Sequence, residues 1–291
     1  MLIYLPMNKC IFLFILFISI NFQGCTRVQG FALKKIHSNH PYNPKWDIEN
    51  STELNILVEK ILNQPFFYLG SGNSCYAFVS KDEKYVLKFL KQKRMDSQNW
   101  KNILLFKKNE IQRKNQVRED SFTSYKIAYE ELKNETGLIF LHLNKTNNLK
   151  KKVAITNQKG QIYQLNIDDM EFFIQKKASI GYSSIETLIK TERIDNAMDN
   201  IYSLLSFIVK RGKMGIADDD MQFFKNFGFI GDQPIEVDIG EFRKNPMQKN
   251  PDVIKKEILE VSKQLIVWIS EHHPILLPQV ETQIQKVVDE V

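Results

Sequence analysis

Cysteine is scarce in this chain of 291 residues. The three cysteines, Cys10, Cys25 and Cys75, match no zinc-binding pattern and no disulfide framework. A fold held together by disulfides or a structural zinc ion is therefore not expected. We expect Cys75 to be a small space-filling residue of a strand rather than a nucleophile.

Beyond the amino terminus, the chain has no apolar run of the ~20 residues that a membrane span needs. The rest of the chain is therefore expected to be soluble. At the amino terminus, Lys9 precedes the apolar stretch Cys10–Ile20, the pattern of a secretory signal. Gly24-Cys25 resembles the end of a bacterial lipoprotein signal. Residues 1–25 are therefore predicted to be a signal peptide or membrane anchor, which makes the protein secreted or membrane-anchored, with lipidation of Cys25 as one version.

Charge of one sign is in only mild excess, with a net charge of +6 and a pI near 9.0. The densest basic run, Lys145–Lys152, has no aromatic ladder beside it, so it is interpreted as a solvated loop, and nucleic acid is not an expected partner. The composition, 43% hydrophobic and 25% charged, is that of a globular chain able to form one core or two lobes.

Three strand-like runs follow a linker at 26–50 and a predicted helix that begins at Ser51 and ends before Pro65. The runs cover 66–69, 76–80 and 84–90, so they predict a meander of three strands. The turn between the first two runs contains Gly70, Ser71 and Gly72, and the third run contains Lys88.

The middle of the chain is predicted to hold a surface helix over 96–118 and a second helix over 121–135, which carries Glu131 and is closed by Gly137. Further strands are expected at 138–143, 153–156, 161–165 and 171–175. From Ser183 onward the apolar spacing becomes helical, and the last two helices are predicted at roughly 251–270 and 278–290.

A second group of polar residues lies in the loop after the helical run that contains Ile201–Val209. Asp218–Asp220 precede Asn226, and Asp238 follows twelve residues later in Asp238-Ile239-Gly240. Gly231-Asp232 is a hairpin turn signal between two short strand-like runs. Asn226 and Asp238 therefore flank a predicted hairpin and are expected to converge.

A glycine loop, a strand lysine, an aspartate, an asparagine and an Asp-x-Gly, in that order, resemble the ATP site of the protein-kinase-like superfamily over about 65–240. The short carboxy-terminal part resembles the atypical and small-molecule kinases. The resemblance implies an α+β, two-lobed fold, with a β-rich N-lobe at 51–178 and a small helical C-lobe with the catalytic loop at 179–291.

The resemblance also implies ATP and Mg²⁺ as cofactors and a hydroxyl group as acceptor. Gly70, Ser71, Gly72 and Lys88 would hold the nucleotide phosphates, and a helix glutamate, Glu131 or less favourably Glu130 or Glu135, would pair with Lys88. Asn226 and Asp238 would bind Mg²⁺. Asp220 would act as the catalytic carboxylate together with Lys88, and 171–176 would lead into the hinge that holds adenine.

The chain departs from the family pattern at several positions. Cys75 replaces the third glycine, the His-Arg-Asp triplet is absent, and Met221 occupies the usual position of the catalytic aspartate. Asp220 is one residue further from Asn226 than the pattern requires.

Three hypotheses therefore remain open. The first is an ATP-dependent phosphotransferase acting on a small molecule, glycolipid or protein. The second is a pseudokinase that binds nucleotide or acts as a scaffold, and the third is a surface lipoprotein with an unrelated α+β domain. Nucleotide binding with Mg²⁺ separates the first from the third, and turnover separates the first from the second.

Overall fold

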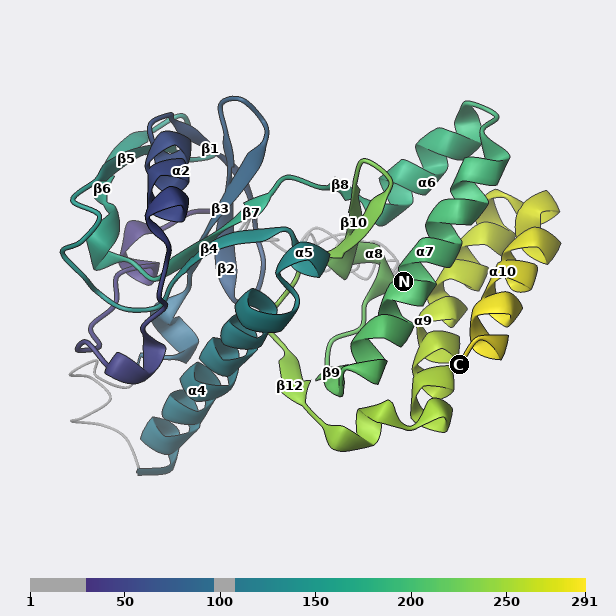
Figure 1. Cartoon of the computed structure of the whole chain (residues 1–291). Helices are drawn as coiled ribbons and strands as arrows, with labels where there is room; N and C mark the ends of the chain where they lie inside the picture. The colour runs from purple at the N-terminus through teal and green to yellow at the C-terminus, as the bar shows by residue number, and fades with distance from the viewer. Residues whose placement is uncertain (1–29, 97–107) are drawn as a thin grey trace, which may run out of the picture. The chain divides into compact units, whose positions relative to one another are not determined.

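A seven-stranded sheet is followed in the chain by a mainly helical part, which makes the fold mixed α+β, consistent with a two-lobed kinase-like fold (Figure 1). The computed structural model describes residues 30–96 and 108–291, and 31–291 form one unit. The predicted signal or anchor at 1–25, including Cys25, lies outside the described residues. No helix within the described ranges combines the length and the apolar character needed to cross a membrane.

The sheet has the strand order β4-β7-β3-β2-β1-β5-β6 and is antiparallel except where β1 pairs with β5. The predicted meander is present, because β1, β2 and β3 are neighbours in this order. A short turn follows Ser80, whose hydroxyl accepts from Tyr85 N at 3.0 Å and so fixes the path between β2 and β3. The strands are β1 (Phe66–Ser71), β2 (Cys75–Ser80), β3 (Tyr85–Leu90), β4 (Leu138–His142), β5 (Lys152–Thr156), β6 (Ile162–Asn166) and β7 (Phe172–Lys176).

The helix before the sheet, α2 (Thr52–Leu62), begins where the sequence predicts. Ser51 caps it, since its hydroxyl accepts from Leu54 N at 3.2 Å. The segment expected to be a linker is instead part of the fold, because its described residues pack against the sheet and against helix α4 (Lys108–Glu131). Phe31 and Ile36 are buried in the core of the sheet, and Trp46 packs against Phe122 with ring centroids 5.1 Å apart. Two short 3-10 helices, η1 (Leu33–Lys35) and η2 (Pro44–Trp46), lie in this segment.

One long helix, α4 (Lys108–Glu131), replaces the two helices expected at 96–118 and 121–135. The expected break near residue 120 is absent because the chain has no glycine or proline there and one buried face continues through it. Residues 97–107 lie outside the described part. Helix α4 is followed by α5 (Lys133–Thr136). Gly137, with a φ of 61° in the left-handed region, ends α5.

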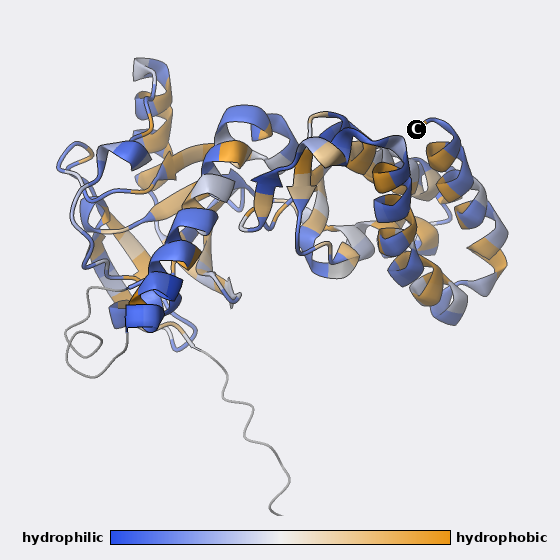
Figure 2. Cartoon of the chain, turned by 90° about the horizontal axis from the view of Figure 1, so that it is seen from below, coloured by the Kyte–Doolittle hydropathy of each residue, from blue (hydrophilic) through white to orange (hydrophobic). Residues whose placement is uncertain are grey.

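The carboxy-terminal part is built around α7 (Ile194–Lys213), which packs against α6 (Gly181–Lys190), α9 (Pro251–His272) and α10 (Leu277–Asp289). These helices bury one apolar face each, and Figure 2 shows orange and blue residues on different sides of the helices. The shorter elements are η3 (Gln92–Arg94), η4 (Ile167–Asp169), β8 (Ser179–Ile180), β9 (Ile216–Asp218), α8 (Phe223–Asn226), β10 (Phe227–Ile230), β11 (Gln233–Glu236), β12 (Phe242–Lys244), η5 (Pro246–Lys249) and η6 (Pro274–Leu276).

Two small pairings bring the polar residues of this part together. β10 and β11 form the predicted hairpin around Gly231, and β9 pairs with β12 in a second antiparallel ladder. Asp218 ends β9, and Asp238 lies between β11 and β12. The aspartate cluster and the Asp-x-Gly segment therefore become neighbours through backbone pairing.

Candidate active site

The glycine turn, Gly70–Gly72, differs from the expectation, because Gly70 and Ser71 are still part of β1 and pair with Ala77 and Tyr76 of β2. The backbone of this segment is open to solvent. A side-chain carbon added to Gly70 or Gly72 would meet no atom within 4 Å, so a ligand can approach the backbone there. Gly72 N donates to Cys75 O at 3.1 Å, which closes the turn. Ser71 is already bound, because Lys91 Nζ donates to its Oγ at 2.6 Å and also to Gly72 O.

Lys91, which the sequence did not single out, is the residue that binds the glycine turn. Its side chain is buried, its ammonium lies 4.4 Å from the centre of the Tyr76 ring, and burial lowers its pKa. Lys91 directly follows β3 and holds the glycine turn through Ser71 and Gly72, while Lys88 lies within β3 and reaches Val237 O.

Lys88 lies in the middle of β3, opposite Ala77 of β2 and Phe173 of β7. Its Nζ donates to Val237 O at 2.7 Å and lies 5.5 Å from the centre of the Phe173 ring. Because Val237 directly precedes Asp238, the strand lysine reaches the Asp-x-Gly segment. Two motifs 150 residues apart in the sequence are thus brought together.

Asp238 retains exposed surface, yet the surrounding protein desolvates its carboxyl group and raises its pKa. Lys88 and the Gly240 backbone N–H lower the pKa, and Asp218 and Asp220 raise it. All three aspartates and Lys88 therefore act on the same small region.

Asn226 and Asp220 form one connected loop. Asn226 is buried, and its Nδ2 donates to Asp220 O. Its backbone carbonyl accepts from Val237 N at 2.6 Å, which brings it to the segment that carries Asp238, as the predicted hairpin requires. Asp220 N donates to Asp218 Oδ1 at 3.1 Å, so the extra residue before Asn226 is accommodated in an ordered turn.

The predicted pair between Lys88 and a helix glutamate is absent. Glu131 forms an ion pair with Lys244 of β12 instead. The physical reason is the orientation of α4, whose buried face carries Phe122, Tyr125 and Ala128, so the side chain of Glu131 points elsewhere. The other two candidates are also paired elsewhere, Glu130 with Lys126 and Glu135 with Lys210.

A cluster of buried charges lies beneath the loop of Asp220. Arg211, which is fully buried, pairs with Glu257 through Nη2 and approaches Glu236 Oε2 with its Nε at 3.6 Å. Asp218 is a third carboxyl group in this cluster. Burial raises the pKa of Glu257 to about 7 and that of Glu236 well above its ordinary range, because three carboxyl groups share one guanidinium in a desolvated place.

Asn226 and Asp238 offer the kinds of oxygen ligand that Mg²⁺ prefers. Mg²⁺ is usually held by one or two carboxylates together with substrate phosphates and waters. Among the described residues, no group of three or more His, Cys, Asp or Glu side chains is arranged to hold a metal ion. The amide nitrogen of Asn226 is engaged by Asp220 O, so its carbonyl oxygen is the atom suited to a cation. A cation would also offset the carboxylate repulsion at Asp238.

A large cavity of about 930 Å³ lies elsewhere, between α2, the segment 42–50 and the end of β4. Its polar floor is internally bonded: His142 contacts Met170 O and Thr146 Oγ1, and Asn144 donates to Asp47 Oδ1 at 2.8 Å. The residues that carry the motifs converge instead beside Lys88. A smaller cavity of about 100 Å³ lies close to the glycine turn and is lined by Ser74, Lys91, Arg94, Met95, Val117, Asp120, Ser121, Tyr125 and Glu241.

No family model matches the chain, and no curated protein matches it. Among solved structures, it is similar to a 2.2 Å crystal structure of WbdD at 14% identity and a TM-score of 0.37, covering 73% of this chain and 44% of that chain. It is also similar to a medium-resolution structure of the bifunctional kinase-methyltransferase WbdD at 16% identity and a TM-score of 0.34, covering 73% and 43%. The chain thus spans less than half of the WbdD chains. So low a similarity carries no argument, and the kinase-like interpretation depends on the motifs and contacts described above.

Proposed function

We propose that the protein is an ATP- and Mg²⁺-dependent phosphotransferase that acts on a hydroxyl group. The observation that carries the proposal is the hydrogen bond from Lys88 Nζ to Val237 O, which joins the strand lysine to the Asp238 segment. Transfer of a γ-phosphoryl group needs mainly positioning and charge stabilisation. A lysine, a glycine turn and metal-binding oxygens in one place meet that need.

The side chains can be given separate tasks under this proposal. Gly70, Ser71 and Gly72 bring the backbone close to the phosphates, and Lys88 supplies the positive charge. Asp238 and the Asn226 side-chain carbonyl hold Mg²⁺, which neutralises developing phosphate charge when bound. Residues 171–176 lead into the hinge for adenine.

Asp220 is the proposed residue for the acceptor. Its carboxylate would orient the attacking hydroxyl group and take its proton, a contribution of typically ~10²–10⁴-fold. The support is the hydrogen bond that Asn226 Nδ2 donates to the backbone carbonyl of Asp220, which holds the Asp220 backbone beside the Asn226 side chain.

A pseudokinase that binds nucleotide without turnover is the second candidate. The observation that favours it is the pairing of Glu131 with Lys244, which leaves Lys88 without the helix carboxylate of the family pattern. Export through residues 1–25 also belongs to this candidate, because ATP is scarce outside the cytoplasm.

Thermal unfolding with ATP and Mg²⁺, followed by a turnover assay, tests both candidates. A ligand at 100 times its dissociation constant stabilises a folded protein by ~2.7 kcal/mol, so binding should raise the melting temperature clearly. Binding with phosphate transfer supports the phosphotransferase, and binding without transfer to any acceptor supports the pseudokinase. Absence of ATP binding refutes both.

A further inference from the structure

In the family pattern, a carboxylate on the helix at the place of α4 pairs with the strand lysine. Here α4 is attached to the sheet by a different charge pair. In the described part of the chain, Lys88 has its short polar contact with Val237 O and no ion pair with α4. Arg118 is the one charged side chain on the buried face of α4, next to Phe122, over whose ring the guanidinium lies at 4.2 Å. Its partner is Glu171, the residue immediately before β7.

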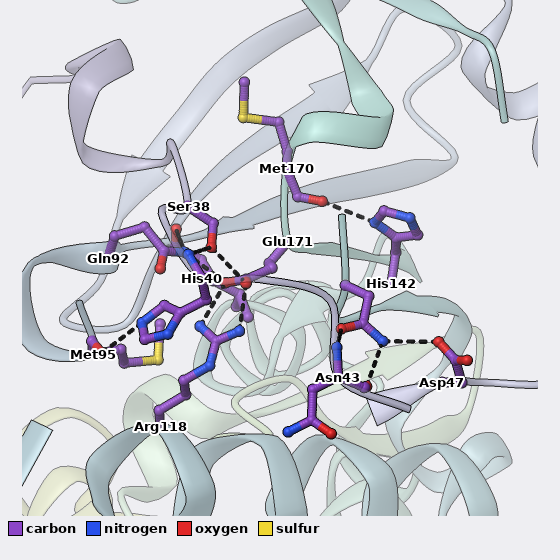
Figure 3. A network of polar contacts seen from close by, with 12 residues as sticks. Ser38, His40, Asn43, Asp47, Gln92, Met95, Arg118, His142, Met170 and Glu171 are labelled. Atoms are coloured by element: carbon purple, nitrogen blue, oxygen red, sulfur yellow. Dashed lines mark hydrogen bonds and ion pairs between the residues drawn. The ribbon is translucent and has the colours of Figure 1, made fainter. Parts of the chain in front are cut away.

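The Arg118–Glu171 ion pair has a geometry that is fixed by several hydrogen bonds. Arg118 Nη2 donates to Glu171 Oε1 at 2.6 Å and Nη1 donates to Oε2 at 3.2 Å, so the contact is bidentate (Figure 3). Glu171 is buried and also accepts from Ser38 Oγ at 2.9 Å and Gln92 Nε2 at 2.7 Å. Four donors on one buried carboxylate allow a single arrangement, and the planar fork of arginine fixes direction as well as distance.

The same helix is bonded to the Asp-x-Gly segment. Ser124 Oγ donates to Ile239 O at 2.7 Å and accepts from Phe242 N at 2.7 Å. Ile239 directly follows Asp238. Helix α4 therefore links the sheet that carries Lys88, through Arg118, to the segment that carries Asp238, through Ser124.

We propose that Arg118 and Glu171 are positioning residues that hold α4 and so set the place of Asp238 relative to Lys88, in the role that a lysine–glutamate pair has in the family pattern. This inference rests on the proposed function of the site. Under this proposal, Lys88 needs no helix carboxylate and is available to bind the nucleotide phosphates. Helix α4 does not have to move to bring Lys88 and Asp238 together. Ser124 transmits the position of the helix, and Tyr125 packs against Phe173 beside Lys88 with ring centroids 5.3 Å apart.

The test compares ATP·Mg²⁺ with adenosine, measured calorimetrically on the full chain. Adenosine lacks the groups that Lys88 and Asp238 would bind, so a general loss of structure lowers both affinities, whereas misplacement of Asp238 lowers only that of ATP·Mg²⁺. Arg118→Met should weaken ATP·Mg²⁺ by about tenfold relative to adenosine, within the range of coupling that packed networks carry. Arg118→Lys, which keeps the charge, should recover part of the loss.

Arg113→Met is the matched control, because it removes the same kind of side chain from an exposed part of the same helix, where Arg113 pairs with Glu110. It should leave the ratio of the two affinities unchanged. If Arg118→Met does not fold, Arg118→Met with Glu171→Met removes both buried charges and answers the same question. A folded variant of either kind with the wild-type affinity ratio overturns the inference. A wild-type protein that binds no ATP overturns the proposed function itself.

Discussion

Glu257 should make the stability of the protein fall as the pH rises through the range from 5 to 8. The residue is buried on α9, where it accepts from Arg211 and Gln248. Burial raises its pKa from 4.5 to about 7 in the folded protein, although Arg211 lowers it. The Glu257→Gln variant keeps the shape of the protonated side chain and removes its titration.

The direction follows from the two protonation states. Between pH 4.5 and about 7, the folded protein keeps the proton on Glu257 while the unfolded chain has lost it. The unfolded state then binds fewer protons, so the free energy of unfolding decreases as the pH rises. The stabilising contribution is complete below pH 4.5 and is lost above about pH 7.

The magnitude is set by the same difference. At ~1.36 kcal/mol for each tenfold change in proton affinity, a pKa of about 7 instead of 4.5 corresponds to about 3 kcal/mol as an upper value. Wild type and Glu257→Gln should have similar stability at pH 5. The variant should be more stable by up to about 3 kcal/mol at pH 8, because glutamine carries no charge to desolvate.

Urea unfolding followed by circular dichroism at several pH values measures this difference. Glu260→Gln is the control, because Glu260 lies on the same helix but is exposed, and Lys263 lowers its pKa. Its difference from wild type should not change between pH 5 and 8. Curves for wild type and Glu257→Gln that run parallel over this range would refute the assignment of a raised pKa to Glu257.

Three further outcomes are expected. Asp238→Ala should abolish Mg²⁺-dependent ATP binding, which calorimetry measures, whereas Asp220→Asn should keep binding and stop transfer in a turnover assay. If Asp238→Ala binds ATP as well as the wild type does, the metal assignment is wrong. Gly137→Ala should lower the stability by about 1 kcal/mol or more in urea unfolding, because alanine is strained at the φ of 61° found there. A reporter fused to residues 1–25 should reach the membrane or beyond it, and a Cys25→Ala change that leaves attachment intact removes only the lipoprotein version.

The pattern of the sheet was open to prediction because its signals are local. Alternating runs and turn residues indicate β1, β2 and β3, and they place Lys88 inside a strand. The turn at Gly231 likewise predicts that Asn226 and Asp238 converge, and the structure ties their backbones together through Val237. Short-range chemistry thus places the candidate residues on their elements.

The pairing of α4 could not be predicted from the presence of acidic residues alone. Which carboxylate meets Lys88 depends on the rotation of the helix, and this rotation is set by Phe122, Tyr125 and Ala128 packing against the sheet. The buried face of α4 was a usable signal, since Glu131 does not belong to it. The role of 31–50 had no such signal, because Ser38 meets Glu171 across 133 residues of sequence.

The balance of charge in the candidate site predicts that ATP binds as its Mg²⁺ complex. Asp220 and Glu241 both add to the negative charge around Asp238, and the pKa of Glu241 is raised first by burial and then by Asp238. Lys88 opposes this at Asp238, and Arg94 opposes it at Glu241. Bringing phosphate groups to this place adds like charge unless a cation comes with them.

Calorimetry with ATP in Mg²⁺ and in EDTA tests this dependence. We expect affinity to fall in EDTA for the wild type, and the gain from Mg²⁺ to shrink as the pH is lowered, because a proton on Asp238 competes with the metal. Adenosine, which carries no phosphate, should bind equally in both solutions. ATP binding that is unchanged in EDTA would show that the carboxylates do not act on the phosphates, and Asp238 would then have no role as a metal ligand.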